Sequence, residues 1–223
     1  MPETKEIVKI LETLKQSQKG IRKTNLNREA KEEGNYSPYQ TLISCLISLR
    51  VRDEVSEKIS RELFKVAKTP KQMIKIPNKK LEKIIYQSGY YKNKAKAIKK
   101  ASMQIIKEFN GKVPDSREKL ISLYGVGPKT ANIVLAFSFN KQVIPVDTNV
   151  HRISNRLGWI KTGKFKFEDS ELELMKIVPK EYWREINGIF ILHGKKICVP
   201  ISPFCSRCPI RNYCKRIGVT TSR

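Results

Sequence analysis

Four of the five cysteines of this chain lie close together near its C-terminal end. Their spacing is C-x6-C-x2-C-x5-C, and the four residues are Cys198, Cys205, Cys208 and Cys214. Thiols this close in sequence either form disulfides or hold a metal centre. The N-terminal stretch MPETKEIVKILETLKQ is charged and amphipathic and has no apolar secretory leader. We therefore expect a reducing compartment, where such a cluster holds a metal.

Spacing alone does not identify the metal. Zinc sites usually combine two short C-x2-4-C arms, and here Cys205 and Cys208 form one such arm and the other cysteines form none. This favours a [4Fe–4S] cluster, with zinc as the first alternative and four unrelated core cysteines as the second. Cys45 lies in an apolar segment far from the cluster, and we expect it to be part of the core.

The chain carries a large positive charge. It has 45 lysines and arginines against 21 aspartates and glutamates, which gives a formal net charge of +24. No acidic residue follows Glu185. This charge indicates a polyanion as partner, with a solvated lysine-rich face as the alternative. A membrane surface is disfavoured because no basic stretch has a wide apolar face, and no apolar run has transmembrane length.

Apolar residues recur at helical spacing along nearly the whole chain. After a polar connector over residues 18–36, Ser37-Pro38 begins an apolar helix, and Asp53 and the pair Asp115/Glu118 are expected to cap two others. Further helices are predicted near 70, 78, 92–109, 129–139, 148–157, 167–178 and 181–197, and Asn110-Gly111 is expected to close the helix over 92–109. Only residues 142–146 look extended, and they are too short for a sheet. The sequence therefore predicts an all-α protein.

Residues 120–137, LISLYGVGPKTANIVLAF, predict two helices joined by a tight turn. Gly125, Val126 and Gly127 form the turn, and Pro128 takes the first position of the second helix. Glycines allow close approach of a ligand, and a helix N-terminus presents N–H groups to an anion. The turn is thus a candidate site for a nucleic-acid phosphate. An ordinary helical hairpin with a glycine turn is the alternative.

Lys129 and Asp147 are the candidate catalytic residues. Lys129 lies in the first turn of the helix after the hairpin, where the helix dipole and nearby basic residues disfavour an ammonium and favour a nucleophilic amine. Asp147 begins another helix, where a carboxylate can act as the cap. Facing one sugar, the amine could form a Schiff base at C1′ while the carboxylate supports a cationic sugar. The alternatives are an exposed charge for Lys129 and capping alone for Asp147.

Together these motifs resemble the endonuclease III family, the iron–sulfur branch of the helix–hairpin–helix DNA glycosylases. The resemblance is carried by GVGPKTA, by VDT, whose aspartate follows the lysine by 18 residues, and by LHGKKIC at the start of the cysteine cluster. It covers about 36–214 and implies two helical domains flanking a DNA-binding cleft. A six-helix barrel with the hairpin would comprise 31–141, and an iron–sulfur domain would combine 1–30 with 142–223.

The resemblance implies a bifunctional DNA glycosylase/AP lyase that removes oxidised pyrimidines and cuts the strand 3′ to the abasic site by β-elimination. Lys129 matches the family's nucleophile, Asp147 its catalytic aspartate, and the four clustered cysteines its [4Fe–4S] ligands. The cluster looks structural in this family and places a basic loop, here the 199–204 region and its basic neighbours, on phosphate. The partner would be double-stranded DNA with a damaged or abasic nucleotide. We expect a monomer, cytoplasmic and associated with the nucleoid.

The chain departs from the family pattern near the expected lesion site. YGVGPK stands where PGVGRK is usual, and Asn149 replaces a histidine. Arg50 aligns with a glutamine that fills the gap left by the flipped base, and Tyr90 aligns near a wedging leucine. Arginine can stack and donate twice, and tyrosine can stack among bases. Alternative substrates are therefore mismatched uracil or thymine, or an oxidised purine. A non-catalytic, metal-bearing DNA-binding module is the alternative function.

Overall fold

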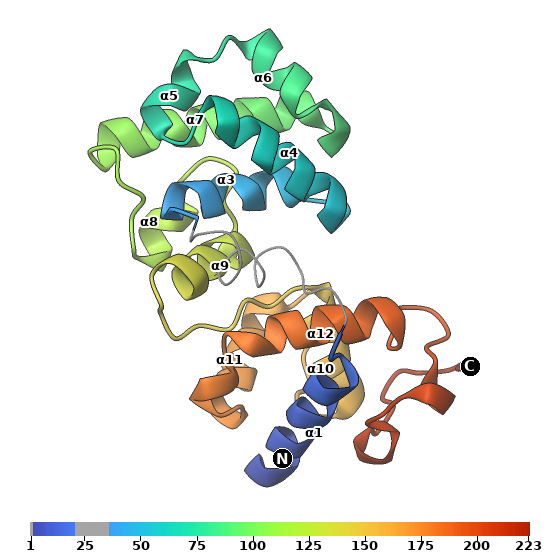
Figure 1. Cartoon of the computed structure of the whole chain (residues 1–223). Coiled ribbons are helices and arrows are strands. Elements are labelled where there is room, and N and C mark those ends of the chain that lie inside the picture. The colour runs from blue at the N-terminus through green and yellow to red at the C-terminus, as the bar shows by residue number, and fades with distance from the viewer. Residues whose placement is uncertain (1, 21–35) are drawn as a thin grey trace. The chain divides into compact units, whose positions relative to one another are not determined.

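The computed structural model describes residues 2–20 and 36–223 (Figure 1). Regular secondary structure within these residues is helical throughout, with no strand among them, so the all-α prediction is confirmed. The described residues form two compact units, one of residues 36–141 and one that combines 2–20 with 142–223. The predicted boundary between residues 30 and 31 and most of the predicted connector lie outside the described residues. The domain limits therefore remain a proposal.

The unit of residues 36–141 is built around α3 (Pro38–Ser48). Ser37 caps this helix, because its hydroxyl accepts from the Gln40 amide at 3.3 Å and the Gln40 side chain accepts from the Ser37 amide at 3.1 Å. Residues 41–47 are buried without interruption, including Cys45, which is 3% exposed. Helices α4 (Asp53–Val66) and α9 (Pro128–Ser138) pack against α3. The apolar helix is thus the centre of this unit, and Cys45 is core, as predicted.

The remaining helices of this unit include one long basic helix, α7 (Tyr91–Glu108), which packs against α3 and α5. After its last helical residue, Glu108, the chain turns away at Asn110 and Gly111, whose φ angles are 52° and 78°. The Gly111 amide donates to the Ile105 carbonyl at 2.9 Å. This is the glycine stop that the sequence predicts. The shorter elements are α5 (Pro70–Lys75), α6 (Asn78–Ile84), the 3-10 turn Tyr86–Ser88 and α8 (Arg117–Ile121).

Two predicted helix caps are wrong. Asp53 is the first helical residue of α4, and Arg52 precedes it at the cap position. Helix α8 is capped by Ser116, whose hydroxyl accepts from the Lys119 amide at 3.4 Å. The preceding Asp115 instead forms an ion pair with Lys141 at 3.5 Å. In both cases an acidic residue near a helix N-terminus is favoured by its charge, which a sequence pattern does not distinguish from capping.

The other unit joins the first helix of the chain to its C-terminal part. Helix α1 (Thr4–Ser17) packs on α12 (Glu185–Lys196), and α12 also contacts α10 (Thr148–Leu157). The apolar face of α1 is fully buried, and its members are Ile7, Ile10, Leu11 and Leu14. Helix α11 (Phe167–Ile177) packs beside α10. The helix predicted over 181–197 is divided into the 3-10 turn Lys180–Tyr182 and α12.

The extended segment before α10 is not a strand but is firmly held. Ile144 and Val146 are buried, and the side-chain amide of Asn187 donates to the Pro145 carbonyl at 2.7 Å. This contact fixes the backbone just before Asp147. None of the helices in residues 2–20 and 36–223 has both the length and the apolarity that crossing a membrane requires.

Candidate catalytic residues and cysteine pocket

The hairpin between α8 and α9 depends on its first glycine. Gly125 has a φ of +82°, and a Cβ there would lie 3.1 Å from the Ala97 Cβ. Gly127 has a φ of −100°, and a Cβ there would meet no neighbouring atom of the described residues within 4 Å. Between them Val126 is buried, and its amide donates to the Leu123 carbonyl at 3.1 Å. The fold therefore requires glycine at 125, whereas at 127 the protein leaves room that a ligand could use.

Side chains of α7 hold this hairpin in place. Gln104 accepts from the Tyr124 amide at 2.7 Å and donates to the Ser122 carbonyl at 3.2 Å. The ammonium of Lys100 lies 4.4 Å from the centre of the Tyr124 ring, a cation–π contact. Helix α7 thus holds the residues that lead into the turn. Tyr124, unusual at this position, acts as part of that support.

Lys129 lies at the start of α9, directly after the hairpin. Gly127 is the N-cap and Pro128 takes the first helical position, as predicted. Lys129 follows in the first turn and is exposed. The N-terminal end of a helix carries partial positive charge on its amides, so phosphate is a suitable neighbour there. Lys129 belongs to the unit of residues 36–141 and Asp147 to the other unit, and their pairing stays a prediction.

Asp147 caps α10, as the sequence predicts. One carboxylate oxygen accepts from the amides of Asn149 and Val150 at 2.8 and 2.9 Å, and the other accepts from the Asn149 side chain at 3.2 Å. The residue is half-buried. Three donors from its own helix therefore fix the direction of the carboxylate without an arginine or lysine among them.

Arg50 and Tyr90 lie at helix ends in the unit of residues 36–141. Arg50 follows the end of α3, and Tyr90 is the residue before α7. Both are exposed, Tyr90 at 70%. Their φ angles are 58° and 48°, in the left-handed region that non-glycine residues rarely adopt. Such backbone persists where surrounding contacts impose it and is frequent at functional sites.

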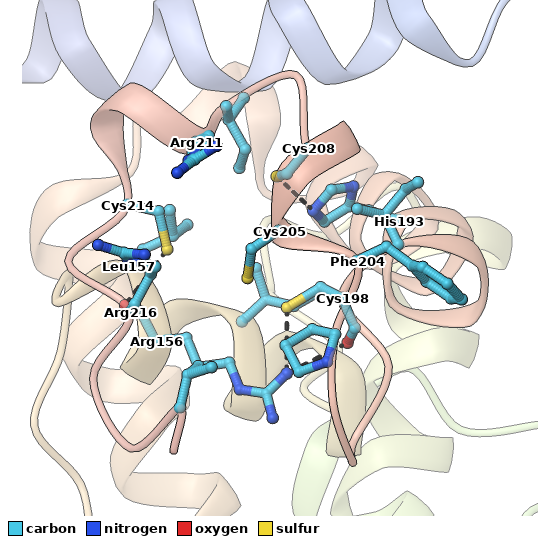
Figure 2. Close-up of a pocket in the computed structure, with 15 residues that line it drawn as sticks. Arg156, Leu157, His193, Cys198, Phe204, Cys205, Cys208, Arg211, Cys214 and Arg216 are labelled. Atoms are coloured by element: carbon cyan, nitrogen blue, oxygen red, sulfur yellow. Dashed lines mark hydrogen bonds between the residues drawn. The ribbon is translucent and has the colours of Figure 1, made fainter. Parts of the chain in front are cut away.

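The four clustered cysteines line one pocket (Figure 2). The pocket has about 420 Å³ of empty space, part of it open to solvent, and Ile153, Leu157 and Ile210 contribute apolar wall. Burial raises the pKa of the Cys208 thiol to about 11. The pocket therefore disfavours a bare thiolate, and a cation bound there would reverse that preference.

The arrangement of the cysteines bears on the kind of metal they could hold. Among the described residues, no three side chains of Cys, His, Asp or Glu are placed to hold a single metal ion. A four-iron cluster binds each thiolate through a different iron atom and so needs more widely spaced ligands. Four thiols around one largely apolar space fit such a cluster.

Two arginines of α10 hold the start of the cysteine loop. Arg156 donates to the Cys198 sulfur at 3.3 Å, to the Val199 carbonyl at 2.8 Å and to the Pro200 carbonyl at 2.6 Å. Arg152 donates to the Cys198 carbonyl at 3.1 and 2.9 Å. Figure 2 shows the Arg156 guanidinium directed at Cys198. The sequence analysis did not identify either arginine as a site residue. The one hint in the sequence is that the two lie four residues apart and therefore on the same side of one helix.

Arg152 also connects the cysteine loop to the candidate carboxylate. Its guanidinium donates to the Asn149 side-chain oxygen at 2.9 Å, and Asn149 in turn donates to Asp147. A Cβ at Gly194 of α12 would collide with the same Asn149 oxygen. A continuous line of hydrogen bonds thus joins Asp147 to the carbonyl of Cys198 within this unit.

The other side of the pocket is lined by a neutral histidine. Nε2 of His193 lies 3.7 Å from the Cys208 sulfur. Burial, helped by the nearby positive charge of Arg152, lowers the pKa of His193 to about 4. The ring is therefore uncharged at neutral pH and adds polarity to the pocket without adding charge.

The C-terminal residues close over the loop between the first two cysteines. The guanidinium groups of Arg223 and Arg207 lie 3.9 and 4.4 Å from the centre of the Phe204 ring. The Arg223 amide donates to the Pro203 carbonyl at 2.8 Å, and the Ser206 amide donates to the Arg223 carbonyl at 3.0 Å. Two positive charges are thereby fixed beside residues 199–204.

Comparison with known proteins places the chain in a family. Residues 43–180 match the profile of the HhH-GPD superfamily of base excision DNA repair proteins. The chain is 45% identical over 178 residues to endonuclease III of Thermotoga maritima, covering 80% of this chain and 83% of that protein. It is 36% identical over 179 residues to endonuclease III of Bacillus subtilis, with 80% and 81% covered. A solved structure of a trapped endonuclease III–DNA covalent intermediate matches with a TM-score of 0.82 and 33% identity, over 97% of each chain.

Proposed function

Because the chain belongs to the endonuclease III family of the HhH-GPD superfamily, we propose that Lys129 and Asp147 are its catalytic residues. Family membership makes the chain a bifunctional base-excision repair enzyme, a DNA glycosylase with AP-lyase activity. The observation that carries the residue assignment is the position of Lys129 in the first turn of α9, directly after the glycine hairpin. We further propose oxidised pyrimidines as substrates, on the strength of the family resemblance.

In this proposal Lys129 is the nucleophile. Its neutral amine attacks C1′ of the damaged nucleotide, the N-glycosidic bond breaks, and the departing base takes up a proton. The sugar ring then opens to a protonated Schiff base between Lys129 and C1′. Loss of a proton from C2′ and departure of the 3′ phosphate break the C3′–O bond and cut the strand. Water hydrolyses the Schiff base and returns the free lysine.

Asp147 supplies negative charge in this proposal. The sugar becomes cationic as the base leaves, and a fixed carboxylate stabilises that charge without needing to reorganise. The three donors to Asp147 support this role, because they hold the carboxylate in one orientation. Asn149 and Arg152 position it and do not react.

The proposed partner is double-stranded DNA that contains a damaged or abasic nucleotide. The net charge of +24 supports binding to phosphates, with a steep dependence on salt. Gly125, Val126 and Gly127 would bring the hairpin backbone against one phosphate. Arg50 would fill the gap left by the flipped nucleotide and Tyr90 would wedge between neighbouring bases. Their exposure at helix ends supports these roles.

We propose that Cys198, Cys205, Cys208 and Cys214 hold a [4Fe–4S] cluster. Four thiols, an apolar wall and a guanidinium donor to one sulfur are chemically suited to it. When bound, the cluster supplies cross-links that fix the C-terminal segment. Arg207 and Arg223, which pack on Phe204 at the end of the 199–204 loop, would then present their guanidinium groups to DNA phosphate.

Borohydride trapping on a duplex with one abasic site tests the nucleophile. Wild type is expected to form a covalent adduct that Lys129→Ala loses. Lys141→Ala is the matched control, because Lys141 is also exposed and lies just beyond the other end of α9. If Lys129→Ala still forms the adduct in wild-type yield, another amine is the nucleophile. Loss in both variants would point to damage to the fold.

A pair of cysteine variants tests the cluster. Cys205→Ser should weaken the visible absorption of the purified protein and lower its melting temperature, because three thiolates hold a cluster poorly. Cys45→Ser makes the same chemical change in the core of the other unit, and should leave the visible absorption intact. A colourless wild-type protein that contains zinc would overturn the assignment.

A further inference from the structure

Lys94 is a buried cation whose donors are all used. The residue is 7% exposed, although its neighbours Lys92 and Lys96 on helix α7 are exposed. The ammonium donates to the carbonyls of Ile47, Leu49 and Ser88 at 2.7, 2.8 and 2.7 Å. An ammonium has three N–H bonds, so the number of acceptors matches the number of donors.

This arrangement offsets the cost of burying the charge. Burial alone lowers the pKa of Lys94 to about 8, so the group is still mainly charged at neutral pH. Ile47 and Leu49 lie at the C-terminal end of α3, where the last carbonyls of the helix lack partners and carry partial negative charge. The ammonium therefore occupies the C-terminal end of the most buried helix of its unit.

The three acceptors belong to two segments far apart in sequence. Leu49 directly precedes Arg50, and Ser88 precedes Tyr90 by two residues. Both Arg50 and Tyr90 have left-handed backbone. One ammonium thus ties the segment that follows α3 to the segment that precedes α7, within one residue of Arg50 and two residues of Tyr90.

Tyr90 is an unfavourable start for a helix without such support. It occupies the N-cap position of α7 with φ 48° and ψ 28°, and its side chain makes no capping hydrogen bond. N-cap residues usually have extended backbone and a side chain that accepts from the first turn. The Lys94 amide donates to the Tyr90 carbonyl at 3.0 Å, so Lys94 contacts this junction through both its backbone and its side chain.

We propose that Lys94 is a positioning residue that holds Arg50 and Tyr90 in the geometry that inserts them into DNA at a lesion. This inference rests on the proposed DNA contacts of Arg50 and Tyr90. It adds that their recognition of damage depends on a buried lysine that would itself never touch DNA. The two segments act as one recognition surface because they share a single ammonium.

Lys99 provides a matched control on the same helix. It donates to the carbonyls of Ile74 at 2.7 Å and of Ile76, at the C-terminal end of α5. It is a partly buried lysine that ties backbone carbonyls to α7, but its acceptors are remote in sequence from Arg50 and Tyr90. Lys99→Met therefore removes the same kind of contact without touching the proposed recognition surface.

The experiment compares Lys94→Met with Lys99→Met on two duplexes, one undamaged and one with a tetrahydrofuran abasic analogue opposite the fluorescent base aminopurine. Both variants should lower the melting temperature. Lys94→Met alone should reduce the preference for the abasic duplex by about tenfold, similar to the loss of one stacked base contact, and should weaken the aminopurine response. Lys94→Gln, which keeps two donors, should fall between wild type and Lys94→Met.

Two different results would count against the idea, and they can be told apart. If Lys94→Met and Lys99→Met change the preference equally, Lys94 contributes stability and nothing more. If Arg50→Ala with Tyr90→Ala leaves the preference unchanged, the proposed DNA contacts themselves are wrong. If Lys94→Met does not fold, the intermediate preference expected for Lys94→Gln decides the matter, and a wild-type value there overturns the proposal.

Discussion

The Arg156 guanidinium donates to the sulfur of Cys198 at 3.3 Å, and the same group donates to the two carbonyls that follow in the chain, those of Val199 and Pro200. One arginine that is 8% exposed therefore orders both a candidate metal ligand and the loop after it. Hydrogen bonds of this kind are stronger to an ionised or metal-bound sulfur than to a neutral thiol. The contact is thus one that cluster binding would strengthen.

Arg156→Met should destabilise the unit that contains the cysteines and weaken retention of the cluster. We expect a loss of about 1–3 kcal/mol in the free energy of unfolding, the cost of leaving polar groups without donors. Chemical denaturation gives that number, and loss of visible absorption during dialysis against a chelator reports the cluster. Arg211→Met is the control, because Arg211 lines the same pocket but is exposed. Equal effects in both variants would contradict the role given to Arg156.

Asp147 caps α10, and the catalytic role that we propose for its charge can be separated from capping. Asparagine caps a helix about as well as aspartate, so Asp147→Asn should keep the melting temperature near wild type while slowing base removal strongly. Asp147→Ala should lose about 1 kcal/mol of stability as well. Single-turnover excision and thermal unfolding measured on both variants separate the two functions. A fast Asp147→Asn enzyme would show that the charge is not needed.

The two hairpin glycines should respond differently to alanine. At Gly125 a side chain meets Ala97 and a positive φ, so Gly125→Ala should lower the melting temperature. At Gly127 the backbone suits any residue and no neighbouring atom obstructs a Cβ. Gly127→Ala should therefore leave stability unchanged and weaken DNA binding. If Gly127→Ala binds DNA as wild type does, the phosphate is not placed against this turn.

Acid should destabilise the protein below the ordinary pKa of histidine. Burial lowers the pKa of His151 from 6.5, so the unfolded chain takes up a proton at pH values where the folded protein does not. The free energy of unfolding therefore falls as pH drops from 6.5 towards the lowered pKa. His193, with a pKa of about 4, acts in the same direction.

Replacing His151 tests how much of this loss of stability in acid comes from its lowered pKa. His151→Gln keeps a polar group near Ser170, which now lies 2.7 Å from the histidine ring nitrogen. Denaturant unfolding above and below pH 6.5 should show a shallower decline in the variant than in wild type. If the free energy of unfolding falls equally steeply with pH in the variant and in wild type, His151 does not contribute to the loss of stability in acid.

Local signals in the sequence predicted the helices well, and the reason is physical. The Ser37-Pro38 start, the stop at Asn110 and Gly111, and the Asp147 cap each depend on contacts within a few residues. Such contacts are encoded locally. The cysteine spacing likewise predicted a common pocket, because 17 residues can hardly place four side chains far apart.

The contacts that the sequence could not reveal are all between distant segments. Helical spacing places Lys94 on the face of α7 that carries Ile98, Ala101 and Ile105, but it does not show which carbonyls the ammonium meets. Nothing near α10 marks Arg152 and Arg156 as partners of Cys198. Which charged residue becomes buried depends on where carbonyl groups of other segments end up. The wrong caps at Asp53 and Asp115 have a different, local origin, because the charge of an acidic residue is favourable near a helix N-terminus whether or not the residue is the cap.

The pairing of α1 with α12 has a consequence for synthesis of the protein. Gln18 donates to the Ile189 carbonyl at 3.0 Å across 171 positions of sequence, and Lys15 pairs with Glu185 at 2.8 Å. On the ribosome, residues 36–141 can fold as soon as they emerge, whereas α1 must wait for its partner until translation is nearly finished. The unit that carries Asp147 is therefore completed last. If Lys129 and Asp147 act as proposed, an unfinished chain holds the lysine without a folded unit around the aspartate, and it is not expected to excise bases.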